Sequence, residues 1–216
     1  MSTLFNPDIT LEEAKELIKN GADVNEIDLD GYSPIFYVSS LDVAQLFIKH
    51  DANVNFKNDY GITPLHVMAQ WLYKIEITKL LIMHGADVNA KNKDGWTPIF
   101  YVEDSEATEL LIKYGAEINI KDYYENTILD RKMLQYPTKK QDSIHHAKFL
   151  IDDGAISGKI ETYQLFREYF SLEQQEAFDM FLTLTSDDNI FFQMCVAFQE
   201  GIKNNVSVKI KDMDIV

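Results

Sequence analysis

A five-residue phrase recurs along this chain of 216 residues, and its recurrence constrains the fold more strongly than any other feature. The phrase reads Gly-Ala-Asp-Val-Asn at residues 21–25 and 85–89, and it returns in looser form at 51–55, at 115–119 and, as Gly-Ala alone, at 154–155. The intervals are 30, 34, 30 and 39 residues. A period in this range is typical of proteins that stack one supersecondary unit on the next, so we expect a repeat architecture.

A second phrase, a turn followed by a hydroxyl residue and a proline, alternates with the first. It reads Asp-Gly-Tyr-Ser-Pro at 30–34, Tyr-Gly-Ile-Thr-Pro at 60–64 and Asp-Gly-Trp-Thr-Pro at 94–98. We expect its glycines to adopt positive φ, and Ser33, Thr63 and Thr97 to cap a short helix that begins with the proline. A longer helix follows in each unit, and the glycine of the first phrase ends it in a left-handed cap. Asp51 takes that place once, because aspartate tolerates the left-handed conformation better than most residues.

The two phrases in this order resemble those of the ankyrin-repeat family, whose signature Thr-Pro-Leu-His is intact at Thr63–His66. The resemblance covers residues 8–156 and implies an all-α fold, an ankyrin-repeat solenoid with a helical C-terminal cap or extension. We divide it into a half-repeat at 8–27, repeats at 28–57, 58–91 and 92–121, and a degenerate repeat at 122–156. The first helix should begin near Thr10, because Thr10–Glu13 has the pattern of a capping box.

Departures from the family pattern carry information of their own. The 30-residue repeats are short, and we expect the loss in the connection between their helices, so that Ser39–Ser40 and Asp104–Ser105 turn tightly. Phe36 and Phe100 replace the motif histidine, which exchanges a hydrogen-bonding residue for packing volume. Glu125 stands where the other repeats have the turn glycine, and we expect it to distort its turn.

Residues 157–216 do not repeat and are rich in aromatic side chains. Helices are predicted at Ile160–Phe170, Leu172–Leu184 and Ile190–Ile202, with a capping box at Ser171–Gln174, a strand-like end at 206–211 and a polar loop before this segment at 136–143. Since a solenoid exposes an apolar face at its last repeat, a helical cap is the preferred interpretation. A separate functional module is the alternative.

The charge balance excludes several classes of partner. With 20 Lys and Arg against 35 Asp and Glu, the net charge is −15, which disfavours nucleic acid and anionic membranes and favours a basic protein partner. The single cysteine, Cys195, fits a reducing compartment, and the sequence has neither a long apolar run nor a secretory signal. We expect a monomer in the cytoplasm, or one delivered to a host cell by a route that needs no signal peptide.

Few residues suggest catalysis, and we expect neither an enzyme nor a cofactor. His66 is the motif histidine, which has a structural role in the family that the chain resembles. His145 and His146 are adjacent, and on a helix they would point about 100° apart, so they do not form a usual metal pair. Cys195 lies in an apolar run and is interpreted as core.

The remaining candidate is a binding surface. In ankyrin repeats the hairpin tips and first helices line a concave groove, and the resemblance implies that partner proteins bind there. We expect the residues that flank the turns, together with one tryptophan at the end of a first helix, to be free of packing and to form an aromatic stripe. The alternative is that some of them pack against neighbouring hairpins. These residues are Leu29, Tyr32, Asp59, Tyr60, Ile62, Trp71, Lys93, Asp94, Trp96, Tyr123 and Tyr124.

Two functions of different classes follow from this reading. The first is a protein–protein interaction module that inhibits or recruits its partner, as an immunity protein or an effector does. The second is an enzyme or adaptor with its activity in residues 157–216 and the repeats as its substrate receptor.

Overall fold

The computed structural model describes residues 3–71, 74–135 and 149–156, together with individual positions between 159 and 196. Throughout this described part the regular structure is helical and no residue is in a strand, which confirms the predicted all-α fold. The chain divides into two compact units, Met1–Glu117 and Ile118–Val216. We call them unit 1 and unit 2 and describe each by itself.

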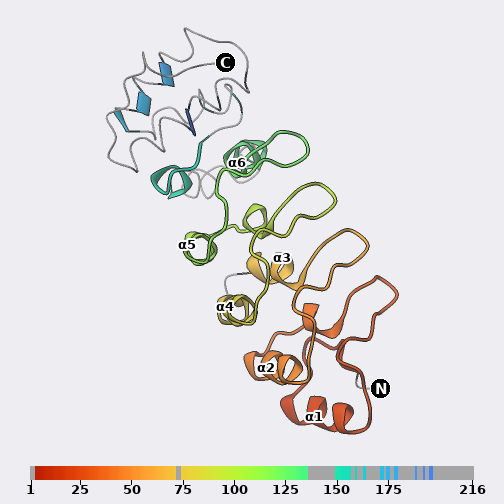
Figure 1. Cartoon of the computed structure of the whole chain (residues 1–216). Coiled ribbons are helices and arrows are strands. Elements are labelled where there is room, and N and C mark those ends of the chain that lie inside the picture. Colours follow the sequence, from red (N-terminus) through yellow and green to blue (C-terminus); the bar gives the residue numbers. More distant parts are fainter. Residues whose placement is uncertain are drawn as a thin grey trace. The chain divides into compact units, whose positions relative to one another are not determined.

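Unit 1 consists of long outer helices and short inner ones. The outer helices have nine residues each: α1 (Leu11–Lys19), α2 (Leu41–Lys49), α4 (Ile75–Met83) and α5 (Ser105–Lys113). The inner elements are the 3₁₀ turns η1 (Pro34–Phe36) and η3 (Pro98–Phe100) and the helix α3 (Pro64–Ala69). In Figure 1 the outer helices follow one side of this unit and the connecting hairpins project from the other. The inner helix α3 contacts α4, η1 and η3, and Phe47, Leu65, Leu81 and Leu111 lie fully buried in the resulting core.

Most of the residues that the 30-residue repeats lack, relative to the 34-residue repeat, are missing from the inner helix. The 34-residue repeat has six residues in α3, whereas η1 and η3 have three each, so the helix accounts for 6 − 3 = 3 of the 34 − 30 = 4 missing residues. The prediction that the connection alone absorbs the deletion was therefore wrong. A single 3₁₀ turn still buries Ile35 and Phe36, or Ile99 and Phe100, so the apolar contacts of the inner helix survive its shortening.

The predicted capping residues behave differently from one another. The capping box at Thr10 is confirmed, since the Thr10 hydroxyl accepts from the Glu13 amide at 3.3 Å and the Thr10 amide donates to the Glu13 carboxylate at 3.0 Å. Ser33 and Thr97 do not cap with their side chains, contrary to prediction. The reason is that the amides they would cap, at Phe36 and Phe100, already donate to the carbonyls of Ser33 and Thr97 and close the 3₁₀ turn.

The outer helices end in left-handed residues, as predicted. Gly21, Gly85 and Gly115 have φ of +93°, +86° and +92°, and Asp51 has φ of +64° in the equivalent place. Gly154 of unit 2 also has a left-handed φ, +93°. Each chain reversal brings the Gly-Ala-Asp-Val-Asn phrase to the same point of every repeat.

The asparagine that ends this phrase joins one repeat to the next. The side-chain amide of Asn55 donates to the carbonyl of Gly85 at 2.7 Å, and its oxygen accepts from the amide of Asp87 at 2.8 Å. Asn25 and Asn89 each make the same pair of hydrogen bonds with the repeat that follows them. This asparagine ladder holds the loops of unit 1 in register.

Unit 2 contains the last repeat and the C-terminal segment. Its helix α6 spans Ile128–Gln135, residues 149–152 are helical, and Asn119 continues the asparagine pattern by bonding to Gly154 and Ile156. The predicted capping box at Ser171–Gln174 is confirmed by hydrogen bonds in both directions. The predicted loop at 136–143, the strand at 206–211 and most of the three C-terminal helices lie outside the described residues, and the boundary at 156 stays a prediction.

Candidate partner-binding surface

Each hairpin of unit 1 is built around one short polar side chain. The Oδ1 atoms of Asp28, Asn58 and Asn92 each accept two backbone N–H bonds, from the residues two and four positions later, at 2.9–3.0 Å. The next glycines, Gly31, Gly61 and Gly95, have φ of +79°, +75° and +80°, as the sequence predicted. A polar side chain that satisfies its own loop amides makes a rigid turn, because those amides no longer need water or other partners.

The corresponding turn of unit 2 keeps the same form despite its glutamate. The Oδ1 of Asp122 accepts from the amides of Tyr124 at 2.8 Å and Asn126 at 2.9 Å, and Glu125 adopts φ of +62°. The prediction of a distorted turn was therefore wrong. The turn geometry is preserved because the aspartate supplies its two hydrogen bonds whichever residue takes the left-handed position.

Neighbouring hairpins in unit 1 contact each other directly. The amide of Lys93 donates to the carbonyl of Tyr60 at 2.9 Å, and the ammonium of Lys57 donates to the carbonyl of Lys91 at 3.2 Å. A Cβ added at Gly61 would lie only 3.0 Å from the Cα of Asn92. We refer to the three adjacent tips, residues 27–30, 57–60 and 91–94, as the hairpin row.

Several predicted binding residues are exposed on these tips. Leu29 is fully exposed and Tyr60 is 65% exposed, and Asp59 and Lys93 are also exposed. In unit 2, Tyr123 and Tyr124 hold the equivalent tip positions and each is 65% exposed. Exposed tyrosine is a residue type enriched at the energetic centres of protein interfaces, and an exposed leucine gains free energy when a partner removes it from water.

Other predicted residues pack inside the repeats instead. Trp96 is half-buried and stacks on Phe100, with ring centroids 6.5 Å apart and planes 4° apart, and its ring meets the edge of Tyr101 at 5.8 Å. Tyr32 is half-buried against Phe36, at 5.1 Å. Ile62 and Asp94 are also partly buried. The expectation that the residues flanking the turns are free of packing was therefore wrong for Trp96 and Tyr32.

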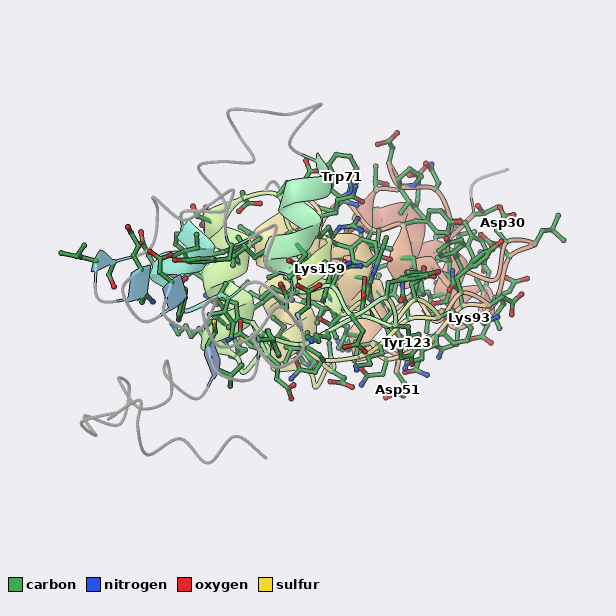
Figure 2. All side chains as sticks on the ribbon, turned by 90° about the horizontal axis from the view of Figure 1, so that it is seen from above. Asp30, Asp51, Trp71, Lys93, Tyr123 and Lys159 are labelled. Carbon is green, nitrogen blue, oxygen red and sulfur yellow. The ribbon has the colours of Figure 1, made fainter. Side chains whose placement is uncertain are left out.

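Trp71 is exposed and belongs to the end of the inner helix rather than to the residues of the hairpin row. It follows the end of α3, whose start is at the hairpin, and it is 45% exposed. Figure 2 labels Trp71 near the top of the view, Asp51 near the bottom, and the tip residues Asp30 and Lys93 on the right. A stripe that joins Trp71 to the tips stays a prediction.

The motif histidine supports the hairpin from inside. His66 is fully buried, its Nδ1 accepts from the Thr63 amide at 3.1 Å and lies 2.7 Å from the Thr63 hydroxyl, and its Nε2 lies 3.1 Å from the Trp96 carbonyl. This network is satisfied when Nε2 carries the hydrogen and donates to Trp96. Burial lowers the pKa of His66 to about 4, so the ring is neutral at pH 7 and serves as a structural bridge between two repeats.

A tyrosine braces the first hairpin in a similar way. The hydroxyl of Tyr37 donates to Oδ2 of Asp28 at 2.6 Å. Partial burial would raise the pKa of the Asp28 carboxyl, but hydrogen bonds from Tyr37 and from the amides of Tyr32, Asp30 and Gly31 outweigh it and lower this pKa. The anionic form of Asp28 therefore holds the turn.

Sequence reasoning missed Ile27 and Lys91, which are exposed on the hairpin row. Both precede the polar residue that organises the turn, as Lys57 does in the middle hairpin. Alignment of the repeats on Asp28, Asn58 and Asn92, rather than on the turn glycines, would have drawn attention to them.

The described residues offer little that could perform chemistry. Among them, no group of three or more His, Cys, Asp or Glu side chains could hold a metal ion. Cys195 is buried, as predicted, and its burial raises the pKa of the thiol, which keeps it protonated. In the part of the chain that the structure covers, no helix has the length and apolar character needed to cross a bilayer.

Comparisons with known proteins agree with the repeat architecture. A family model described as ankyrin repeats in three copies matches residues 8–92, 40–122 and 65–160. Curated relatives include the Ankyrin repeat protein OPG189 of Monkeypox virus, 36% identical over 66 residues, and its namesakes in Variola virus and in Vaccinia virus (strain Copenhagen), each 35% identical over 66 residues. Each match covers 29% of this chain and 12% of the relative, so the chain matches only a small part of those longer proteins.

Proposed function

This chain belongs to the ankyrin-repeat family, and from that premise we propose that its hairpin row binds a segment of a partner protein. Ankyrin repeats are generally protein–protein interaction modules. The observation that carries the proposal is the exposure of Leu29 and Tyr60 on turns whose amides are already satisfied by Asp28 and Asn58. Rigid turns lose little conformational entropy on binding, so more of the contact energy appears as affinity.

The biological role is proposed from the relatives. Because the matched curated proteins are viral, capture of a host protein by an effector explains this chain better than neutralisation of a toxin by an immunity protein. Whether capture inhibits or recruits the partner depends on which surface of that partner is covered. A cytoplasmic monomer is consistent with this role, and the net charge of −15 would steer basic partners towards it.

Activity in residues 157–216 is the alternative. The described residues of that segment favour a packing role over a catalytic one. The rings of Tyr163 and Phe178 are buried with their centroids 5.4 Å apart, and the Tyr163 hydroxyl donates to Asp179 at 2.9 Å. Lys121, the residue just before the last repeat, places its ammonium 4.1 Å from the ring centre of Phe192. These contacts favour a C-terminal segment that packs on itself and against the end of the repeats.

A capture experiment with matched variants tests the proposed function. The immobilised full chain is incubated with an extract of the cells in which it is made, and bound proteins are quantified for wild type, Leu29→Ala/Tyr60→Ala and Met83→Ala. Met83 is the control because it is an exposed large side chain (66%) on α4, outside the hairpin row. We expect a partner that Met83→Ala retains and the double variant loses, with at least ~10-fold weaker binding. Equal retention by both variants would refute the hairpin row as the binding surface.

A further inference from the structure

Equivalent positions of the three hairpins carry side chains of different chemistry. The residues on either side of the organising Asp or Asn are Ile27 and Leu29 in the first hairpin, Lys57 and Asp59 in the second, and Lys91 and Lys93 in the third. All six are exposed. Along unit 1 the hairpin row therefore changes from apolar, through a mixed pair, to basic.

The apolar end is pronounced. Ile27 is 52% exposed and Leu29 is fully exposed, so two branched aliphatic side chains stand in water on one rigid turn. The carboxylates close to them in sequence, Glu26, Asp28 and Asp30, would repel an acidic group. An apolar side chain of a partner is the group that gains most from contact at this end.

The basic end has the opposite preference. Residues 91–94 contain two basic residues, Lys91 and Lys93, and one acidic residue, Asp94. This local excess of positive charge differs from the net charge of −15 for the whole chain. Since Coulomb forces at contact distance depend on the nearest groups, a carboxylate is favoured here even though a distant approach favours a basic protein.

The three hairpins are close enough to act as one surface. The Lys93–Tyr60 and Lys57–Lys91 hydrogen bonds join the second hairpin to the third, and a Cβ at Gly31 would lie 3.7 Å from the amide of Asp59. Packed helices lie about 8–10 Å apart, so two repeat steps span about 16–20 Å. An extended peptide rises about 3.3 Å per residue and covers that span in about five or six residues.

We propose that the hairpin row recognises an extended segment that carries a large apolar side chain and, about five or six residues away, a pair of carboxylates. The apolar group sits on Ile27 and Leu29, and the carboxylates pair with Lys91 and Lys93. This inference rests on the proposed function and specifies the chemistry of its partner.

Fluorescence anisotropy with three labelled synthetic peptides tests the inference on the full chain. The first peptide carries Leu-Phe, a spacer of five Gly and Ser residues, and Glu-Glu; the second replaces Glu-Glu with Lys-Lys; the third has Glu-Glu directly after Leu-Phe and the spacer at its end. The protein variants are Lys91→Glu/Lys93→Glu and, as a matched charge control, Lys79→Glu/Lys113→Glu. Lys79 and Lys113 are exposed on the outer helices α4 and α5, and their reversal changes the net charge by the same amount.

Wild type and the control should bind the first peptide about fivefold more tightly than either of the others, and added salt should reduce that preference. The Lys91→Glu/Lys93→Glu variant should prefer the second peptide instead. Equal binding of the first two peptides to wild type, the same shift in both protein variants, or no binding of any peptide would overturn the inference. If the inference fails while Leu29→Ala/Tyr60→Ala still loses its captured partner, only the chemistry assigned to the segment is wrong and the hairpin row remains the interface.

Discussion

Alanine substitutions can separate two sources of destabilisation at the hairpin turns. One is the strain of a positive φ, and the other is the steric clash of an added Cβ with the neighbouring hairpin. Gly61 and Gly85 both have positive φ, +75° and +86°, so an alanine at either position is strained by about 1–2 kcal/mol. Alanine also restricts the unfolded chain, which returns about 0.4–1 kcal/mol. The net loss from backbone conformation should therefore be about 1 kcal/mol at each site.

The surroundings of the two glycines differ. A Cβ at Gly85 would meet no atom within 4 Å, whereas a Cβ at Gly61 would lie 3.0 Å from the Cα of Asn92 and 3.2 Å from the amide nitrogen of Lys93. Those atoms are backbone, and their displacement strains the bond from Lys93 to the carbonyl of Tyr60. Such overpacking costs about 1–3 kcal/mol, so Gly61→Ala should lose about 2 kcal/mol more than Gly85→Ala.

Urea unfolding of the full chain, followed by circular dichroism, measures the difference. Gly31→Ala is the second control, because its nearest contact, at 3.7 Å, is of ordinary length, and it should behave like Gly85→Ala. We expect similar m-values for all variants, with the lowest midpoint for Gly61→Ala. If Gly61→Ala and Gly85→Ala are equally stable, the hairpins are not in the close contact on which the continuous row depends.

Three further predictions concern stability. The free energy of unfolding should fall by up to about 3 kcal/mol as the pH falls from 6.5 towards 4, because His66 is protonated in the unfolded chain but, with its lowered pKa, stays neutral in the folded chain. Urea titrations at several pH values should show that His66→Phe removes this pH dependence. Thr97→Val should be neutral or stabilising, because among the described residues the buried Thr97 hydroxyl has no hydrogen-bond partner. Thr63→Val removes the hydroxyl contact of His66 and should cost about 1–3 kcal/mol of stability, and a destabilised Thr97→Val would contradict this reasoning. In thermal melts Trp96→Ala should lower the stability by about 2 kcal/mol or more, because the packing of the indole on Phe100 and Tyr101 is lost. Tyr60→Ala should change the stability by less than about 0.5 kcal/mol, and equal effects of the two variants would show that Trp96 is not packed as described.

The sequence by itself determined the features that depend on a few neighbouring residues. The repeat period, the left-handed glycines with Asp51 among them, and the capping boxes at Thr10 and Ser171 all appeared where the sequence predicted them. The left-handed residues and the capping boxes each follow from a backbone conformation or a hydrogen bond within four residues, so the local sequence contains their whole cause. The Asp122 turn also has a local cause, because the hydrogen bonds from the Tyr124 and Asn126 amides to Asp122 preserve it despite Glu125.

The tertiary structure decided what each repeat does with those local elements. Packing reduced the inner helix of a 30-residue repeat to one 3₁₀ turn, and it drew Trp96 and Tyr32 inwards while Leu29 and Tyr60 stayed exposed. The hydrogen bonds that align the hairpins join residues 26–34 positions apart in sequence, such as Asn25 with Asp51 and Lys57 with Lys91. Such contacts form only when one repeat stacks on another. Stacking is therefore what brings the apolar and basic tips of the hairpin row together on one surface.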